Sequence, residues 1–225
     1  MSAPRISVVI PALNEEDAIE AAIHSVHEDA AEIIVVDGGS YDRTWERAAH
    51  AGATVLGREG GRGAQLDHGA RAATGDWLLF LHADTLLEPG WAYDLGALPA
   101  AVVGGAFRFT VESPRRGYRL IEAGVRLRCA LFRLPYGDQA LFVRREVYRD
   151  CGGFPEIPLM EDVAFVARMR RQGRLAFPRS RAFTSARRWE EHGLLRTTLS
   201  NLWLLAQYAA GRSPDRLAAV YLRRA

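Results

Sequence analysis

The stretch DWLLFLHADTLLEPG, residues 76–90, begins as a buried strand and ends on an acid. Residues 77–81 are all apolar, and His82 and Asp84 follow before the chain turns. A charged group at the end of a buried strand is unfavourable unless something pairs with it. Residues two apart on a strand point to the same side, so the spacing predicts that His82 and Asp84 project together from the strand end.

Short apolar runs alternate with amphipathic segments ahead of this stretch. Strands are predicted at 5–11, 31–37, 53–57 and 77–84, and helices at 15–28, 42–52 and 63–75. The first strand is expected to stop at Pro11, which cannot donate a backbone hydrogen bond. This alternation is typical of βαβ units and predicts an α/β fold with a mostly parallel sheet flanked by helices. Ligands bind such open sheets at the carboxyl ends of the strands.

The pattern loosens after residue 90. A strand is predicted over 101–111, and its glycine pair, Gly104 and Gly105, suggests a bulge or a close backbone approach. Further elements are expected as helices at 115–134, 160–173 and 190–211, a strand near residue 139, and a last helix with Ser213 as N-cap and Pro214 in its first turn.

Composition narrows the function classes. Apolar residues make up 48% and charged residues 25%, which is ordinary for a soluble globular protein, and the net charge of +2 gives no sign of nucleic-acid binding. All 29 basic residues are arginines, so mechanisms that need a P-loop lysine or a lysine nucleophile are excluded. The sequence shows neither a secretory signal nor an apolar run near the about 18–20 residues of a membrane span. We therefore expect a cytoplasmic protein.

Two loops at predicted strand ends carry polar residues. VVIPALNEE places Asn14 and Glu15 after the first strand, although Asn14 can also be the N-cap of the next helix. VVDGGSYDRT places Asp37 before Gly38, which lets the backbone turn sharply and approach a ligand. The Asp37 carboxylate can accept a nucleobase N–H or simply form the turn, and both alternatives stay open.

Two more motifs suit a diphosphate. REGGRGAQLDHG offers Arg62 in a glycine-rich loop without a dinucleotide or P-loop fingerprint. Asp84 suits a hard divalent cation that bridges a carboxylate to phosphates, although a lone aspartate there is more often a cap or turn residue. Three roles stay open for His82: a second ligand of the cation, a contact to the nucleotide, or only a partner of Asp84.

One acidic cluster and one basic cluster follow in the second half of the chain. Glu161 and Asp162 open a helix, where the helix dipole alone favours acids. Arg187, Arg188 and Trp189 suit a diphosphate and a sugar face, or else form a solvated basic face with one buried tryptophan.

In this order the motifs resemble glycosyltransferase family 2, inverting nucleotide-sugar enzymes with a GT-A fold. The likeness runs from ISVVIPALNEE to GGFPEIPLMEDV, most of the first 175 residues. LHADT, GDQ and MED are similar to a small bacterial subgroup labelled selenodomain-associated or arsenosugar-biosynthesis glycosyltransferases. The resemblance implies one GT-A domain over residues 1–225, with a nucleotide-binding half at 1–100, an acceptor and catalytic half at 101–189, and C-terminal helices at 190–225.

The resemblance also implies residue roles. Asp162 would be the catalytic base beside Glu161, and Asp84, at the DxD position, would bind Mg²⁺ or Mn²⁺ with His82. The nucleotide would be held by Pro11, Ala12, Asn14, Glu15, Asp37, Gly38, Arg62, Gln65 and Ala83. The diphosphate or acceptor would be held by Gly105, Asp138, Gln139, Arg187, Arg188 and Trp189. Three departures from the family pattern are His82 for the first aspartate of DxD, Asp67 for an asparagine, and Tyr41 for a small residue.

The implied reaction is a single displacement from a nucleoside-diphosphate sugar, with UDP favoured over GDP, to an unknown small-molecule or lipid-linked acceptor. The absence of lysine from the sequence argues against a nucleotidyltransferase, which would normally need a lysine in a glycine-rich loop near its N-terminus. A non-catalytic sugar-nucleotide-binding protein with a decayed metal site stays as the alternative, because His82 replaces a carboxylate. The apolar face of residues 190–211 belongs to the core, to a second subunit in a homodimer, or to a peripheral membrane contact.

Overall fold

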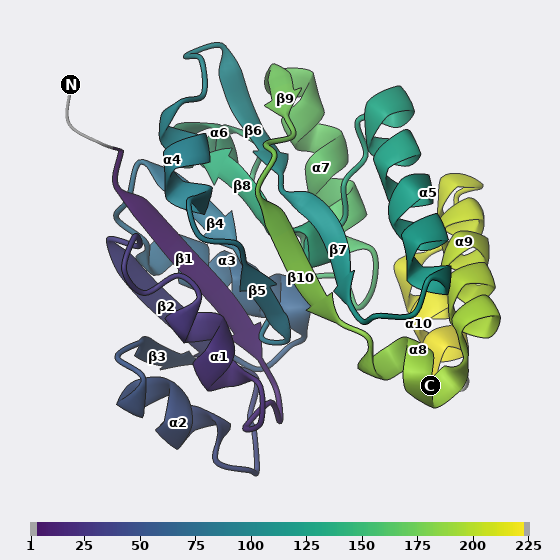
Figure 1. The fold of residues 1–225 in the computed structure, drawn as a ribbon, viewed down its shortest axis with the longest axis horizontal. Coiled ribbons are helices and arrows are strands. Elements are labelled where there is room, and N and C mark those ends of the chain that lie inside the picture. The colour runs from purple at the N-terminus through teal and green to yellow at the C-terminus, as the bar shows by residue number, and fades with distance from the viewer. Residues whose placement is uncertain (1–3, 223–225) are drawn as a thin grey trace.

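The computed structural model describes residues 4–222, in which two sheets carry the strands (Figure 1). The larger sheet has seven strands in the order β3-β2-β1-β4-β8-β6-β9, and β8 alone runs antiparallel to its neighbours β4 and β6. Along the sheet these strands are β3 (Thr54–Gly57), β2 (Glu32–Asp37), β1 (Ile6–Ala12), β4 (Trp77–Phe80), β8 (Leu141–Arg144), β6 (Val102–Ala106) and β9 (Arg174–Ala176). The expected mostly parallel α/β sheet is confirmed.

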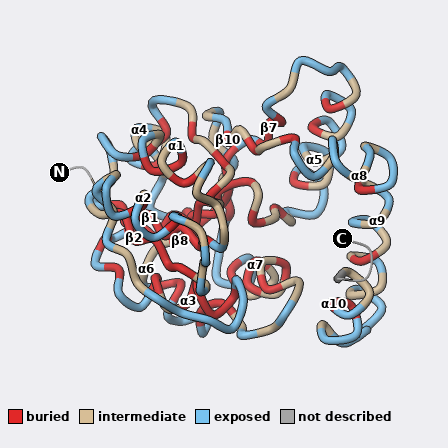
Figure 2. The backbone as a smooth tube through the Cα atoms, turned by 90° about the horizontal axis from the view of Figure 1, so that it is seen from below, coloured by how far each residue is buried: buried red, intermediate tan, exposed pale blue. Residues whose placement is uncertain are grey.

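Helices cover both faces of this sheet. Successive side chains of β1 alternate between the two faces of the sheet: Val8 packs in one core cluster and Val9 in the other. The first cluster includes residues of α1 (Ile19–His24), α2 (Thr44–His50) and α4 (Trp91–Gly96). The second includes residues of α3 (Arg62–Ala72), α6 (Arg145–Asp150) and α7 (Glu161–Gln172). Figure 2 shows the buried backbone running through the middle, between these helices.

Pro11 does not end the first strand, because β1 continues to Ala12. The pairing of β1 with β4 stops at Val9, opposite Phe80, whereas its pairing with β2 continues through Pro11 to Ala12. Val9 accepts a hydrogen bond from the Leu81 N–H on the β4 side, and backbone groups two residues apart point the same way. The missing N–H of Pro11 therefore faces a side where no ladder partner is needed.

The predicted strand at 101–111 is wrong as a single element. It breaks at Phe107 into β6 of the large sheet and β7 (Arg108–Glu112), which joins β10 (Arg181–Ser185) and β5 (Thr85–Leu87) in a second sheet. The glycine pair behaves as expected, since a Cβ on Gly105 would overlap the Ala176 carbonyl oxygen of β9. The register between β6 and β9 also shifts near Gly104.

The C-terminal extension is helical, as expected. It comprises α8 (Arg187–His192), α9 (Leu194–Ala209) and α10 (Pro214–Leu222), and it lies with α5 (Gly117–Phe132) at one end of the molecule (Figure 1). The predicted continuous helix over 190–211 is wrong, because Gly193 adopts φ +87° and separates α8 from α9. None of the helices within residues 4–222 is long and apolar enough to cross a membrane.

Candidate active site

The carboxyl ends of β1 and β2 are braced by one buried side chain. Gln65 on α3 donates from Nε2 to the Ala12 carbonyl at 2.8 Å and to the Val36 carbonyl at 2.9 Å. A Cβ on Gly38 would lie 2.8 Å from that same Nε2 atom, so this position accommodates only glycine without rearrangement. Gln65 and Gly38, expected at the nucleotide, therefore shape the strand ends that would surround it.

The loops after β1 and β2 are tied together. Asp37 accepts hydrogen bonds from the Gly39 and Ser40 N–H groups, both at 2.9 Å, and from the Ser40 hydroxyl at 2.5 Å. Asn14, in the left-handed region at φ +54°, accepts from the Tyr41 N–H at 3.1 Å and donates its own N–H to Ser40 Oγ at 2.9 Å. Asn14 is not the N-cap of α1, which begins further along the chain. Asp37 forms the turn in this structure.

The opening prediction about His82 and Asp84 is wrong in its geometry. β4 ends at Phe80, and a turn follows in which the Thr85 N–H donates to the His82 carbonyl at 3.1 Å. The chain turns here because β5 leaves the large sheet to pair with β10. The two side chains therefore do not share one face of a strand.

His82 lies against the backbone of the turn before β8. A Cβ on Gly137 would lie 2.8 Å from His82 Nε2 and 3.4 Å from an Asp162 oxygen, so both side chains border the same glycine. Burial, with the charges of Arg62 and Arg188, lowers the pKa of His82 to about 3. The imidazole is therefore neutral at physiological pH, so it contributes no positive charge to the site.

Asp84 lies near Glu15 and Arg187. Its carbonyl accepts the Ser185 N–H at 3.1 Å, and its carboxylate accepts from the Thr85 hydroxyl at 3.4 Å. Arg187 donates to both oxygens of Glu15, at 2.9 and 3.1 Å. Burial, reinforced by the charge of Asp84, raises the pKa of Glu15. The loop after β1 and the start of α8 thus meet beside Asp84.

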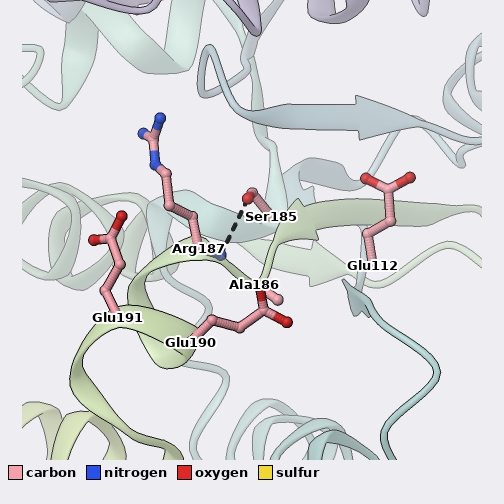
Figure 3. A pocket seen from close by; sticks show the side chains of 6 residues that line it. All are labelled: Glu112, Ser185, Ala186, Arg187, Glu190 and Glu191. Carbon is pink, nitrogen blue, oxygen red and sulfur yellow. Dashed lines mark hydrogen bonds between the residues drawn. The ribbon is translucent and has the colours of Figure 1, made fainter.

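A pocket of about 440 Å³ opens next to this contact (Figure 3). Arg187 projects from its rim, and its backbone N–H donates to Ser185 Oγ at 3.2 Å. Acidic side chains surround the rest of it, namely Glu112, Glu190 and Glu191. The sequence argument missed these three glutamates, because nothing in the sequence indicates that β7 and α8 meet.

The acidic pair at the start of α7 is divided between two roles. Glu161 is fully buried and forms an ion pair with Arg62, which the sequence assigned to a diphosphate. Asp162 is half-buried and accepts the Gly137 N–H at 2.8 Å and the Val163 N–H at 2.7 Å. Asp162 is therefore the member of the pair whose carboxylate is both fixed and accessible.

Asp138 faces the same region. Its Oδ1 atom is buried and, among the described residues, has no hydrogen-bond partner. Burial raises the pKa of Asp138 to about 6; Asp162 and Asp84 also raise it, whereas Arg128 opposes the shift. The Tyr136 hydroxyl is likewise buried without a partner in the described part of the chain. Buried polar atoms are almost always hydrogen-bonded in native proteins, so both mark a place where a ligand, ion or water belongs.

Arg128 and Tyr136 were missed by sequence reasoning. The Arg128 guanidinium lies 3.4 Å from the Tyr136 ring centroid and donates to Gln139 Oε1 at 3.0 Å. Gln139 is buried, and its Nε2 donates to the Phe107 carbonyl at 3.2 Å. Gln139 thus holds the turn at Gly137–Gln139 in shape. Tyr136 directly precedes GDQ, which was an available signal, but Arg128 looks like its neighbouring arginines in the sequence.

Three expected site residues have packing contacts. Gly105 lies inside β6, where it allows the close approach of β9, and no polar role follows from that position. Trp189 is partly buried and packs edge-on against Phe109 and Tyr118. Arg188 lies over the Tyr221 ring at 5.3 Å, and its charge reaches His82.

The oxygen donors fit a hard divalent cation in part. Across residues 4–222 no three His, Cys, Asp or Glu side chains gather as a metal site. Asp84 and the unpartnered Asp138 oxygen are nevertheless the kind of ligand that Mg²⁺ or Mn²⁺ accepts, and such ions usually complete their shell with water and substrate phosphates. The residues present therefore suit a cation that arrives with a diphosphate.

Comparison with known proteins identifies the family. The profile of glycosyl transferase family 2 matches residues 7–151. The chain belongs to this family. Glucosyl-3-phosphoglycerate synthase of Mycolicibacterium smegmatis is 37% identical to this glycosyltransferase over 97 residues, which cover 37% of this chain and 32% of that protein. A PGL/p-HBAD biosynthesis glycosyltransferase of Mycobacterium bovis is 36% identical over 115 residues, covering 46% and 43%. The matches thus span less than half of these relatives.

Solved structures show the same architecture. Glucosyl-3-phosphoglycerate synthase of Mycobacterium tuberculosis in complex with Mg²⁺ and UDP superposes with a TM-score of 0.58 at 25% identity, covering 77% of this chain and 68% of that one. Its complex with Mn²⁺ and UDP-glucose gives 0.57, also at 25% identity. The expected fold class and family are confirmed: the chain has an α/β fold and is a family 2 glycosyltransferase by its family match.

Proposed function

We propose that this glycosyltransferase moves a sugar from a nucleoside-diphosphate donor, UDP in preference to GDP, to an acceptor with inversion at the anomeric carbon. The observation that carries the proposal is the Asp162 carboxylate, which the Gly137 N–H fixes at 2.8 Å beside His82 and near Asp138. A fixed, accessible carboxylate at the carboxyl edge of a parallel sheet is placed as a general base needs to be. The related UDP-bound structures support the donor class.

The proposed donor site follows the ends of β1, β2 and β4. The base would lie against the Asp37 turn and the Pro11–Glu15 loop, with Ala83 at its floor. Asp84 would hold Mg²⁺ or Mn²⁺, with Asp138 or His82 as a second donor, and the cation neutralises charge on the leaving diphosphate when bound. Arg187 and Arg188 supply further positive charge on the same side.

In the proposed reaction Asp162 takes the proton from the acceptor group. The bond from the anomeric carbon to the diphosphate oxygen breaks as the bond to the acceptor forms, and attack from the opposite face inverts the centre. The Gly137 and Val163 N–H groups hold the carboxylate in place during this transfer. A positioned general base contributes about 10²–10⁴-fold to the rate.

We further infer a single domain over residues 1–225, divided as the resemblance implies, and membership of the small bacterial LHADT, GDQ and MED subgroup. The acceptor is a small molecule or a lipid-linked group, and the reaction is placed in the cytoplasm. These assignments rest on the motifs of the sequence and on the family shown by residues 7–151.

A thermal-shift panel tests the donor site. UDP and GDP, each with and without Mn²⁺, are added to wild-type protein, to Asp84→Asn, and to Asp150→Asn as a matched control at an exposed acid on α6. A ligand that binds the folded state raises its apparent stability. We expect UDP with Mn²⁺ to stabilise the wild type and Asp150→Asn but not Asp84→Asn. Equal stabilisation of all three would remove Asp84 from the site. Binding of UDP-sugars without any turnover would favour the non-catalytic alternative.

A further inference from the structure

The helix α5 is apolar on two opposite sides. Its inner side carries Tyr118, Glu122 and Cys129, which are buried. Its outer side carries Leu120, Leu127 and Leu131, which are between 60% and 79% exposed. At 3.6 residues per turn these three leucines form one stripe directly opposite the buried residues. A surface helix normally presents polar residues on its outer side, so this stripe is unexplained by the fold of the chain alone.

The helix α9 repeats the arrangement. Leu195, Leu199 and Leu202 are between 55% and 75% exposed and follow one another at helical spacing. Thr197 and Leu204 are buried on the opposite side. Two separate helices of the same chain therefore carry an outward leucine stripe. Scattered exposed leucines are normal, whereas a gathered apolar patch marks an interaction surface.

The two helices are neighbours. A Cβ on Gly117, the first residue of α5, would lie 3.1 Å from the side chain of Leu194, the first residue of α9. Figures 1 and 2 show both helices at the same end of the molecule, away from α2. We call Leu120, Leu127, Leu131, Leu195, Leu199 and Leu202 the leucine surface.

The chain around α5, which carries half of the leucine surface, is strongly basic. Residues 113–133 contain six arginines and a single acid, Glu122, although the whole chain has a net charge of only +2. Glu122 is buried and paired with Arg119 at 2.6 Å, so it adds no exposed negative charge. Arg116 and Arg126 are exposed beside the leucines. An outer side that combines leucines with arginines complements a layer of anionic headgroups above hydrocarbon.

A second copy of the chain fits this surface less well. In a two-fold contact the same patch faces itself, so the arginines of α5 would approach the arginines of the partner. Like charges brought together at an interface are unfavourable. An anionic bilayer removes that repulsion and also buries the leucines.

We propose that the leucine surface docks on an anionic membrane surface. The inner side of α5 supports the site, because Arg128 donates to Gln139 at 3.0 Å in the turn that holds Asp162 through Gly137. Docking therefore places the Gly137–Gln139 turn close to the lipid–water boundary. The binding itself does not depend on the proposed function, since it needs no turnover.

Vesicle flotation tests the proposal with the full chain. Wild-type protein is mixed with vesicles of phosphatidylcholine alone, or of phosphatidylcholine and phosphatidylglycerol in equal amounts. Three variants are compared: Leu127→Gln, Leu199→Gln, and Tyr93→Gln as a control at an exposed apolar residue of α4. All three positions are exposed, so the variants should fold, and their thermal unfolding is measured alongside.

We expect wild type and Tyr93→Gln to float with the anionic vesicles, and binding to weaken as salt is added. Each leucine substitution should lower the partition coefficient about tenfold, because a buried leucine side chain contributes that much. Failure of the wild type to float with anionic vesicles overturns the proposal. The proposal is also overturned if the wild type forms a dimer without lipid, does not bind vesicles, and becomes monomeric on Leu127→Gln substitution. The leucine surface would then be the contact with a second copy.

Discussion

Replacing Asp138 by asparagine should make the protein more stable at neutral pH. The Oδ1 atom of Asp138 is buried and lacks a hydrogen-bond partner in the described chain. Burial, together with the charges of Asp162 and Asp84, raises the pKa of this carboxyl from its ordinary 3.8 to about 6. The ionised form is therefore disfavoured in the folded state, and an amide of the same shape removes the charge that causes the cost.

The magnitude follows from linkage. Between the two pKa values the folded state binds more protons than the unfolded state, so the free energy of unfolding falls as the pH rises through this window. A shift from 3.8 to about 6 corresponds to at most about 3 kcal/mol. Asp138 retains some contact with solvent, which reduces this value, so we expect Asp138→Asn to exceed the wild type by about 1–3 kcal/mol near pH 7.

Urea unfolding followed by circular dichroism measures the effect. Both proteins are unfolded at several pH values from about 4 to 8, without nucleotide or metal, and the difference in unfolding free energy is plotted against pH. The difference should be small near pH 4, where the native carboxyl is protonated, and should grow until about pH 7. A variant that is less stable than the wild type at pH 7, or a difference that does not change with pH, would refute the reasoning, because Asp138 would then be paired in solution.

Three further substitutions test the geometry. His82→Asp puts a second carboxylate beside Asp162 across Gly137, and repulsion between the two negative charges should lower the melting temperature near pH 7; an unchanged melting temperature contradicts their proximity. Gly105→Ala should destabilise the protein by about 3 kcal/mol or more, since its Cβ would overlap the backbone of β9. Gly124→Ala, in open space on α5, should instead stabilise it by about 0.5–1 kcal/mol, and urea unfolding compares the two.

The apolar runs of β1, β2 and β4 predicted the core of the fold, because a fully buried parallel strand has a continuous apolar sequence. The break at Phe107 was not predictable in this way. The stretch AVVGGAFRFTV has no turn signal at Phe107, although Arg108 and Thr110 beyond it are polar. What divides the stretch is a choice of partner: Gly105 packs on β9, whereas β7 pairs with β10. The split at Gly193 did have a local signal, since a glycine with positive φ commonly ends a helix.

The sequence predicted which residues gather at the strand ends better than it predicted their partners. Asp37 is the last residue of β2 and Asp84 follows the end of β4, as the alternation of strands and helices implied, whereas the role of Asp162 came only from the resemblance. Arg62 instead pairs with Glu161, 99 residues away, and no local pattern carries that information. Long-range side-chain pairing depends on how helices α3 and α7 pack, which single-sequence periodicity does not encode.

The role of Asp162 is the central claim, and release of UDP from UDP-sugars tests it most directly. The rate is measured for wild type and Asp162→Asn, with water or an added acceptor taking the sugar, on proteins shown by calorimetry to bind UDP equally. We predict that Asp162→Asn loses about 10²-fold or more of the rate while donor binding and thermal stability are kept. Turnover by Asp162→Asn at the wild-type rate would contradict the account, because the proton would then leave by another route.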